Sequence, residues 1–464
     1  MWSGRFRQPL DPQFEQWQRS FPFDQKLLRY ELAASRAHAL ALGAAGVLSG
    51  EESNLIVVGL EQIERNSCQE NFFADDEAED VHHFVEKQLV ELVGETGKKL
   101  HSGRSRNEQI ATDLRLFVRE SIDDLRSALG EFLESLLARA SESKSAAMPA
   151  YTHLQRAEPV LVAHWLLAYF EMFWRDAERL KDCRKRVNQC PLGSGAVAGA
   201  PLALDRNRTS QQLGFDRPTA NSMDATSDRD FALELVNALA LLGVHLSRWA
   251  EELILFATQE YGFIRLPEAY STGSSAMPQK QNPDSLELIR GKSARLLGCQ
   301  VALLTAVKGL PLAYNKDIQE TQEPLFDAAA TAANCVRIAT GFMRTVTFNY
   351  DRMRAACESG FMNALACATY LAQRGVPFRE AHEVVAHAVQ RCMEKGCELQ
   401  DLPFEELREF SPAFGSDIYD RLKLESVLAG NDVPGGTAPD RVRQAMHQAR
   451  EKLAALREAH VTHA

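Results

Sequence analysis

The amino-acid sequence predicts a mainly α-helical protein, because helical periodicity dominates it and the alternating pattern of strands is scarce. Apolar residues recur three or four positions apart over residues 110–136, 160–180, 231–256 and 286–307. Polar segments separate these four stretches, and glycine occurs in the second and third of these segments. Four long helices in one region predict a central helix bundle, and the segments between them predict loops held at helix ends.

Two of the four predicted helices carry further information. The helix expected at residues 231–256 is apolar on most of its faces, which predicts burial in a bundle or in a subunit interface. The helix expected at residues 286–307 follows Asn282 and Pro283, a pair typical of a helix start with Asn as the N-cap. The N-terminal end of a helix favours negative charge, so this helix start is a natural place to hold a carboxylate.

The remainder of the sequence suggests more than one domain. Near residues 351–360 the long helical stretches give way to shorter ones, with breaks at residues 375–377 and 434–436. A chain of 464 residues is also too long for one simple core. We expect an N-terminal helical domain, a central helix-bundle domain and a C-terminal helical domain, at residues 1–107, 108–354 and 355–464.

Composition and charge narrow the function classes. Hydrophobic residues make up 45% of the chain and charged residues 25%, as in ordinary soluble globular proteins. A net charge of −11 argues against a general nucleic-acid or membrane-surface binder, although a local group of basic residues could still bind an anionic substrate. The most apolar runs, residues 39–48 and 160–170, are shorter than the ~20 residues that a bilayer span needs. The opening residues lack the apolar core of a signal peptide, so we expect a cytoplasmic protein.

The nine cysteines show neither a Cys-x-x-Cys pair nor a cysteine–histidine cluster with zinc spacing. Free thiols and no metal site are therefore expected. His82 and His83 lie in an acidic segment, which we interpret as a solvated helix face.

The most informative segment is 273–283, Gly-Ser-Ser-Ala-Met-Pro-Gln-Lys-Gln-Asn-Pro. It places two adjacent hydroxyls, Ser274 and Ser275, shortly before Lys280 and a helix start. A serine needs neighbouring positive charge to act as a base, and a lysine with a helix N-terminus would supply it. A Gly-Ser-Ser string alone is more often an ordinary helix-entry loop. The functional interpretation therefore depends on the whole segment.

Three other polar segments contain candidate functional groups. His153, in Tyr-Thr-His-Leu-Gln, could be a general acid or base, although a lone loop histidine is more often without function. Residues 100–107 carry two arginines that could bind carboxylates; a phosphate or nucleic-acid loop is the competing interpretation, which the acidic surroundings disfavour. Residues 314–320 are dense in hydrogen-bonding groups, which suits a substrate with both amino and carboxyl groups. Residues 191–195 are interpreted as a packing turn, because no strand–turn–helix unit surrounds them.

In their order along the chain these segments resemble those of the argininosuccinate lyases, a family of the fumarase/aspartase superfamily. The resemblance runs from residues 2–6, Trp-Ser-Gly-Arg-Phe, to residues 435–439. Residues 102–107, 151–155 and 273–282 resemble segments common to the superfamily, whereas residues 221–227 and 314–320 are more particular to this family. The resemblance implies a three-domain, largely helical fold and a homotetramer whose active sites are shared between subunits.

The resemblance also implies the reaction and the site. Argininosuccinate would be split into arginine and fumarate without a cofactor or a metal. Ser274 would be the catalytic serine and His153 its partner acid or base, with the order in which they act left open. Lys280 would stabilise developing charge, and Glu287 would orient the histidine from another chain. The positions that match substrate-binding residues of the family are Ser20, Asn107, Thr152, Arg229, Asn282, Tyr314 and Gln319.

Two positions depart from the family pattern. Gln322 stands where the family usually has a substrate-contacting lysine, and Glu158 stands where glutamine is usual. Both changes put carboxylate affinity in doubt, unless another cation compensates. They also give the only support to an alternative function, a structural protein that keeps the fold without catalysis.

Overall fold

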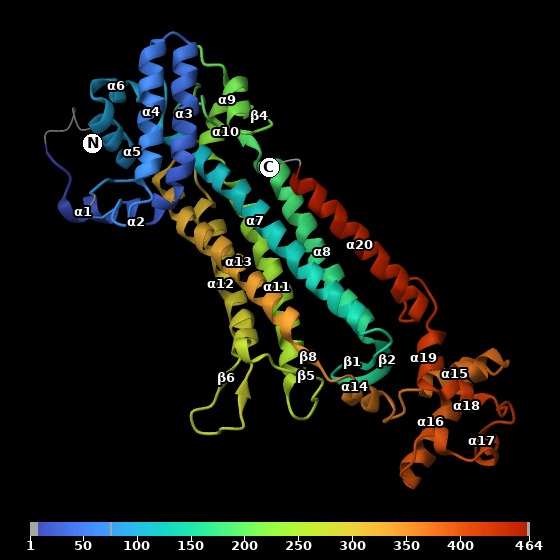
Figure 1. Cartoon of the computed structure of the whole chain (residues 1–464). Coiled ribbons are helices and arrows are strands. Elements are labelled where there is room, and N and C mark those ends of the chain that lie inside the picture. Colours follow the sequence, from blue (N-terminus) through green and yellow to red (C-terminus); the bar gives the residue numbers. More distant parts are fainter. Residues whose placement is uncertain (1–7, 75–76, 462–464) are drawn as a thin grey trace. The chain divides into compact units, whose positions relative to one another are not determined.

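The computed structural model describes residues 8–74 and 77–461, with side chains as far as residue 457. The expected motif at residues 2–6 lies outside the described residues. The protein is mainly α-helical, as the sequence predicts (Figure 1). The division into three domains stays a prediction.

The chain forms two compact units, each built from three segments. Unit 1 comprises Met1–Arg126, Glu178–Leu241 and Ala294–Ala332, and unit 2 comprises Ser127–Ala177, Leu242–Ser293 and Ala333–Ala464. Five long helices contribute residues to both units: α7 (Arg106–Glu142), α8 (Val162–Val187), α11 (Asp230–Ala257), α12 (Asp284–Val307) and α13 (Gln322–Thr345).

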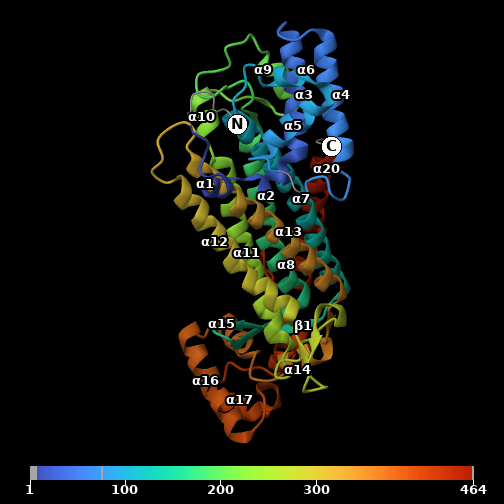
Figure 2. The same ribbon diagram turned by 90° about the vertical axis from the view of Figure 1, so that its left-hand side faces the viewer.

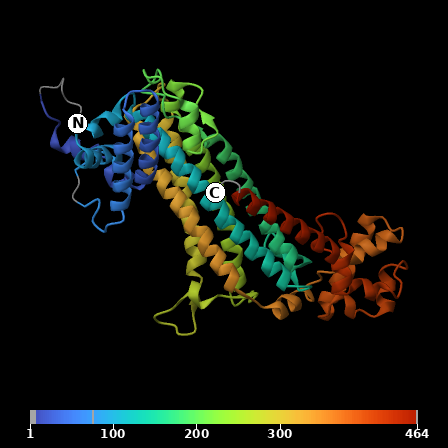
Figure 3. The same ribbon diagram turned by 45° about the horizontal axis from the view of Figure 1, so that its top comes forward.

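The shorter elements of unit 1 lie before, between and after these helices. They are α1 (Pro12–Trp17), α2 (Phe21–Asp24), η1 (Gln25–Leu27), α3 (Leu28–Ala44), α4 (Gly50–Asn66), α5 (Val81–Val93), α6 (Glu95–Lys98), η2 (Lys99–His101), β3 (Gln189–Cys190), α9 (Arg206–Gln212), β4 (Arg217–Pro218), α10 (Ser222–Ser227) and η4 (Lys316–Thr321). Helices α3 and α4 lie side by side (Figures 1 and 3). Helix α5 packs closely on α4 at Gly59, where a Cβ atom would lie 2.8 Å from Leu89 Cδ1.

Unit 2 contains the remaining elements. They are β1 (Ala147–Thr152), β2 (Gln155–Leu161), β5 (Ile264–Arg265), η3 (Glu268–Tyr270), β6 (Thr272–Gly273), β7 (Gln281–Asn282), β8 (Thr347–Phe348), α14 (Tyr350–Cys357), α15 (Ala364–Gln373), α16 (Phe378–Lys395), η5 (Leu399–Asp401), α17 (Phe404–Phe410), α18 (Ile418–Leu422), α19 (Leu424–Gly430) and α20 (Pro439–Val461). The C-terminal helices α15, α16 and α17 cluster together (Figure 2). Buried side chains such as Leu371, Val385 and Leu407 form a core there.

The long helices pack on one another within each unit. In unit 2 the ring of Phe132 (α7) lies 4.9 Å from Phe173 (α8) and 5.4 Å from Trp249 (α11). In unit 1, Phe117 of α7 lies 4.9 Å from Phe326 of α13. Helix α11 is long and apolar enough to cross a membrane by composition alone, but most of that stretch is buried, as in the core helix of a soluble protein. The predicted helix bundle is therefore present.

Two helix starts differ from the sequence expectation. Helix α8 begins at Val162 because residues 155–161 form β2, which pairs with β1. Helix α12 begins at Asp284, and the Pro283 carbonyl accepts the Glu287 N–H at 3.0 Å, so Pro283 holds the N-cap position. The prediction that Asn282 is the N-cap was therefore wrong by one residue. Asn282 pairs with Thr272 in the β6–β7 hairpin, and a residue before proline favours extended backbone.

Candidate active site

A cavity of about 1030 Å³ lies in unit 1. Its wall combines acidic, basic and neutral hydrogen-bonding groups. The lining residues are Ser20, Asp24, Glu79, Asp80, His82, His83, Glu86, Lys87, Val90, Glu91, Lys98, His101, Arg106, Asn107, Ile110, Tyr314, Lys316, Gln319 and Gln322. Five positions expected to bind substrate thus share one cavity: Ser20, Asn107, Tyr314, Gln319 and Gln322. Their individual roles stay predictions.

Ser20 and Asp24 lie four residues apart around α2, which brings their side chains together. Asp24 accepts hydrogen bonds from the Ser20 hydroxyl at 2.6 Å and from the Val81 backbone N–H at 3.0 Å. Burial raises the pKa of Asp24 to about 6, although the Ser20 hydrogen bond opposes the shift. The cavity therefore contains a carboxylate that is ionised only above mildly acidic pH.

Asp80 is the second carboxylate of the cavity wall and the N-cap of α5, where it accepts the His83 N–H at 2.8 Å. The Arg106 guanidinium donates to the same oxygen. Burial would raise the pKa of Asp80, but His82 and Arg106 outweigh this effect and hold the pKa well below its ordinary value. Asp80 is therefore a permanent negative charge that can attract a cationic group of a ligand.

The positively charged and hydrogen-bond-donating groups of the cavity wall come from the start of α7 and from η4. Arg106 and Asn107 are the first residues of α7, whose N-terminal end carries partial positive charge. In η4, Lys316 Nζ lies 3.6 Å from Glu79 Oε1, and Gln319 Nε2 donates to the Gln18 carbonyl at 3.1 Å. The cavity can thus receive anionic groups as well as cationic ones.

The expectation that Arg229 contacts substrate stays a prediction. The Arg229 side chain is buried and is not part of the cavity wall. Burial lowers its pKa to about 10, and the neighbouring Tyr314 phenol opposes this shift. Tyr314 lines the cavity, and burial raises its pKa. Within unit 1, the charge of Arg229 therefore lies near a residue of the cavity wall, Tyr314.

Gln322, the departure from the family pattern, is only 4% exposed. It is the first residue of α13 and lines the cavity. Its Oε1 atom has no hydrogen-bond partner among the described residues. A buried amide oxygen without a partner is unfavourable, so this atom is available to a ligand donor.

The remaining expected residues belong to unit 2. Thr152 is the last residue of β1, where it pairs with Gln155, and His153 is the first residue of the two-residue turn of the β1–β2 hairpin. His153 and Leu154 have φ angles of 54° and 58°, the left-handed pair of a type I′ turn. Neither is Asn or Gly, so the turn is strained, and such strain is typical of functional sites. His153 is exposed.

Ser274 lies in the loop that joins β6 to β7 and projects before α12 (Figures 1 and 3). Its Oγ accepts hydrogen bonds from the backbone N–H groups of Ala276 at 3.3 Å and Met277 at 3.1 Å. Two donors on one hydroxyl oxygen stabilise negative charge there, which favours an alkoxide. Residues 275–281 are exposed.

Three further expected residues accompany this loop. Lys280 Nζ donates to Asn282 Oδ1 at 2.7 Å, so the amide holds the ammonium group. Glu287, on the first turn of α12, is exposed and lies 3.7 Å from Arg290. Glu158, which stands where the family usually has glutamine, lies in β2. Arg156, two residues earlier in the same strand, donates hydrogen bonds to the Ala356 carbonyl and to Ser359.

Sequence reasoning missed the acidic part of the cavity. Asp24 and Asp80 were not expected, and the interpretation of His82 as solvated was wrong, since this ring is 3% exposed. A signal was present in the sequence. Asp80 precedes the apolar run that begins at Val81, as an N-cap does, and His82, Val85 and Leu89 recur along one face of α5.

The chain matches the Lyase family over residues 4–298 and the family described as argininosuccinate lyase C-terminal over residues 361–429. The argininosuccinate lyase of Koribacter versatilis is 59% identical over 459 residues, which cover 99% of this chain and 98% of that protein. The argininosuccinate lyase of Heliobacterium mobile is 49% identical over 453 residues, covering 98% and 99%.

Solved structures of other proteins share the fold. An EDDS lyase in complex with formate has a TM-score of 0.86 and 29% identity, covering 95% of this chain and 88% of that one. A class II fumarase from Schistosoma mansoni has a TM-score of 0.74 at 16% identity, covering 87% and 91%, and it shows the fold alone. The curated relatives match almost the whole chain and the family matches cover most of it. This chain is therefore a lyase and belongs to the argininosuccinate lyase family, within the fumarase/aspartase superfamily.

Proposed function

We propose that this lyase splits argininosuccinate into arginine and fumarate, as a step of arginine biosynthesis in the cytoplasm. Family membership supports the reaction. The single observation in the structure that carries it is the mixed lining of the unit 1 cavity. Argininosuccinate combines an ammonium and a guanidinium group with carboxylates. A wall with Asp24 and Asp80 beside Arg106 and Lys316 offers counter-charges to both kinds of group.

Ser274 removes a proton from the carbon next to a substrate carboxylate, and an aci-carboxylate forms. The two backbone N–H groups on Ser274 Oγ support this role because they stabilise an alkoxide before the reaction begins. Lys280 stabilises the charge that develops on the substrate. The C–N bond then breaks, and His153 delivers a proton to the departing guanidino nitrogen. Fumarate and arginine remain.

The active site is completed by subunit association in a homotetramer. The exposure of the Ser274 loop and of the His153 turn supports this proposal, because proton transfer from carbon requires a site that excludes water. Helix α12 also exposes large apolar side chains, which are Leu288, Leu297, Val301 and Leu304. Apolar surface of this kind is typical of a protein interface. Glu287 lies on the same helix, where it could reach the histidine of another copy.

A substrate panel tests the proposal. Fumarate absorbance is followed after addition of argininosuccinate, adenylosuccinate, aspartate or malate to the wild-type protein and to Ser274→Ala. We expect fumarate from argininosuccinate with the wild type alone. Fumarate from another substrate, with none from argininosuccinate, would overturn the substrate assignment. Equal, negligible turnover by both proteins, with the same folded assembly, would favour the structural-protein alternative.

A further inference from the structure

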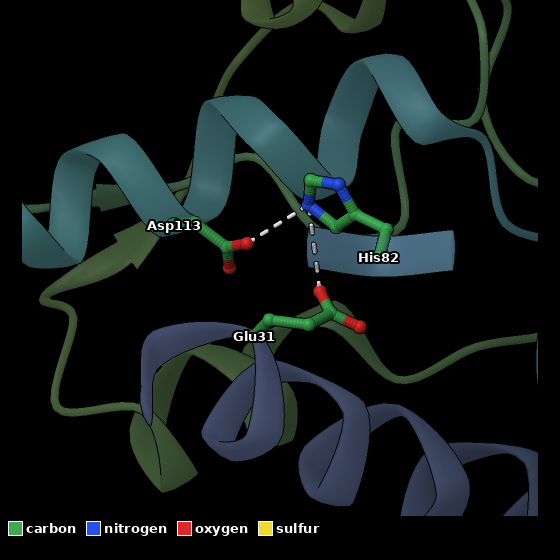
Figure 4. A group of neighbouring side chains, drawn as sticks. All are labelled: Glu31, His82 and Asp113. Atoms are coloured by element: carbon green, nitrogen blue, oxygen red, sulfur yellow. Dashed lines mark hydrogen bonds and ion pairs between the residues drawn. The ribbon is translucent and has the colours of Figure 1, made fainter. Parts of the chain in front are cut away.

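A buried group of ionisable side chains adjoins the cavity, whose wall includes one of them, His82. His82 reaches from α5 between Glu31 of α3 and Asp113 of α7 (Figure 4). Its Nε2 atom lies 3.0 Å from Asp113 Oδ2 and 3.7 Å from Glu31 Oε2. All three side chains are at most 2% exposed. The reaction proposed above uses none of the three.

Other buried groups hold one of the two carboxylates, Glu31, in place. Glu31 Oε1 accepts hydrogen bonds from the Ser35 hydroxyl at 2.5 Å and from Gln109 Nε2 at 3.1 Å. Arg104, whose side chain is 4% exposed, lies 3.8 Å from the same oxygen and donates to Ser35. The cluster therefore joins α3, α5, α7 and the loop before α7.

Charge balance defines the state of the imidazole. The ionisable groups of the cluster are two carboxylates, Glu31 and Asp113, one guanidinium, Arg104, and the ring of His82. The neighbouring Asp80 is paired with Arg106, so this pair adds no net charge. Burial, with Glu31 beside it, raises the pKa of Asp113 to about 7, so both carboxylates are ionised above that pH. Two negative charges and one fixed positive charge then leave room for one more positive charge, which a protonated imidazole supplies. Buried charge without compensation is strongly unfavourable. Burial of the ring disfavours its charge, but the surrounding carboxylates, Glu31 foremost, raise the pKa of His82 to about 10.

A divalent metal ion is the competing occupant, since the ligand atoms of Glu31, His82 and Asp113 lie within 4.8 Å of one another. A metal would require a neutral imidazole. With Arg104 at 3.8 Å from Glu31, a divalent ion would then leave one uncompensated positive charge in the buried cluster. A proton on His82 leaves none.

The cluster meets the cavity at His82 and Asp80, which both line its wall. His82 Nδ1 lies 3.8 Å from Asp80 Oδ1, at ion-pair distance, and has no hydrogen-bond partner among the described residues. We propose that His82 is a positioning residue: held as an imidazolium by Glu31 and Asp113, it fixes Asp80 as an ionised carboxylate that faces the cavity. This inference rests on the proposed function, because Asp80 is taken to receive a cationic group of the substrate.

The protonation state is tested without any activity measurement. In the full-length protein labelled with 15N-histidine, one histidine should keep imidazolium nitrogen shifts above pH 8.5. Its signal should be absent from His82→Gln, or from His82→Gln/Asp113→Asn if the single variant does not fold. Loss of every imidazolium signal by pH 8, or stoichiometric metal retained in the purified protein, would overturn the proposal.

Kinetics test the positioning role. His82→Gln should raise KM for argininosuccinate roughly tenfold or more, because the contact of Asp80 with a cation loses its geometry, and change kcat by less than about threefold. The matched control is His245→Gln. His245 is also a buried histidine beside a carboxylate, with Nδ1 2.7 Å from Asp176 Oδ2, but it belongs to the bundle of unit 2. This control should lose thermal stability and keep its KM.

A double variant separates charge from shape. Asp113→Asn alone leaves an excess positive charge in the cluster, and His82→Gln alone leaves an excess negative charge. His82→Gln/Asp113→Asn restores the balance and should recover much of the melting temperature lost by either single variant. Additive losses, or a KM of His82→Gln no higher than that of His245→Gln, would overturn the proposal. If the wild type released no fumarate from argininosuccinate, the proposed function would fail, while the nitrogen shifts would still decide the state of His82.

Discussion

Ser20 Oγ donates a 2.6 Å hydrogen bond to Asp24 Oδ2 at the wall of the cavity. Because burial raises the pKa of Asp24 to about 6, this carboxylate changes charge within the range where enzymes are assayed. The Ser20 hydroxyl is the main group that opposes the shift. The charge of the cavity wall therefore depends on pH through this pair.

The first prediction is an acidic limb in the pH profile. Only ionised Asp24 attracts a cationic substrate group, so kcat/KM should fall as the pH decreases through about 6. Ser20→Ala should move this limb to higher pH, because the carboxylate loses a stabilising donor. Asp24→Asn should abolish it. A limb in Asp24→Asn identical to that of the wild type would contradict this assignment.

The same group has a predicted effect on stability, with the opposite direction. The folded protein binds the Asp24 proton more tightly than the unfolded chain does, because the pKa of this group is near 3.8 in the unfolded chain. Its contribution to the free energy of unfolding is therefore complete at about pH 4 and is lost as the pH rises through about 6. Denaturant titrations of the wild type and of Asp24→Asn at these two pH values measure the contribution of Asp24 to the free energy of unfolding. A wild-type contribution that grows between pH 4 and 6, relative to Asp24→Asn, would refute the direction of the shift.

The second prediction concerns Gln322. Replacement by lysine should lower KM about tenfold and change kcat less, because a remote charge-assisted contact binds ground and transition states about equally. Gln322→Met is the matched control, since it keeps the length of the side chain without polarity. Because residue 322 is 4% exposed, the lysine should also lower the melting temperature. An unchanged KM with an altered kcat would place this residue in the chemistry.

The third prediction concerns His153, at φ 54° in the hairpin turn. Asparagine tolerates left-handed backbone, so His153→Asn should retain the wild-type melting temperature and still lose at least ~10²-fold in kcat. Leu154→Gly tests the strain at φ 58° and should stabilise the protein by up to ~1 kcal/mol. A large loss of stability in His153→Asn would mean that the residue is mainly structural.

The fourth prediction concerns the bundle core in unit 2. Phe132 is fully buried and contacts both Phe173 and Trp249. Phe132→Ala should lower the free energy of unfolding by ~3–5 kcal/mol, because it removes apolar contacts and leaves a cavity. Trp17→Ala, at a residue that is 80% exposed, is the control and should change stability little. Equal melting temperatures for the two variants would contradict the packing described here.

The long helices could be predicted from the sequence because apolar residues recur at helical spacing over many turns, as in α7 and α11. It does not reveal the β1–β2 hairpin, whose turn is His153–Leu154 where Asn-Gly would be the usual signal. It also misplaces the α12 start by one residue, because pairing with Thr272 extends Asn282. In each case a tertiary or cross-strand contact overrides the local preference.

The site was predictable only in part, for a related reason. Segments rich in polar groups identified Asn107 and Tyr314, which line the cavity. Asp24 and His82 depend on burial by other elements, which a local pattern does not contain. The acidic neighbours of His82 suggested a solvated face, yet Glu31 and Asp113 come from other helices and bury the ring.

The central claim is that Ser274 and His153 belong to one shared active site in an assembly of several copies. The most direct measurement mixes His153→Asn with Ser274→Ala under conditions that exchange subunits, and follows fumarate release from argininosuccinate. If the two residues come from different copies, equal mixing should restore intact sites at roughly a quarter of the wild-type level, while each variant alone stays inactive. A mixture as inactive as its components, in assemblies shown by mass to contain both variants, would contradict the account.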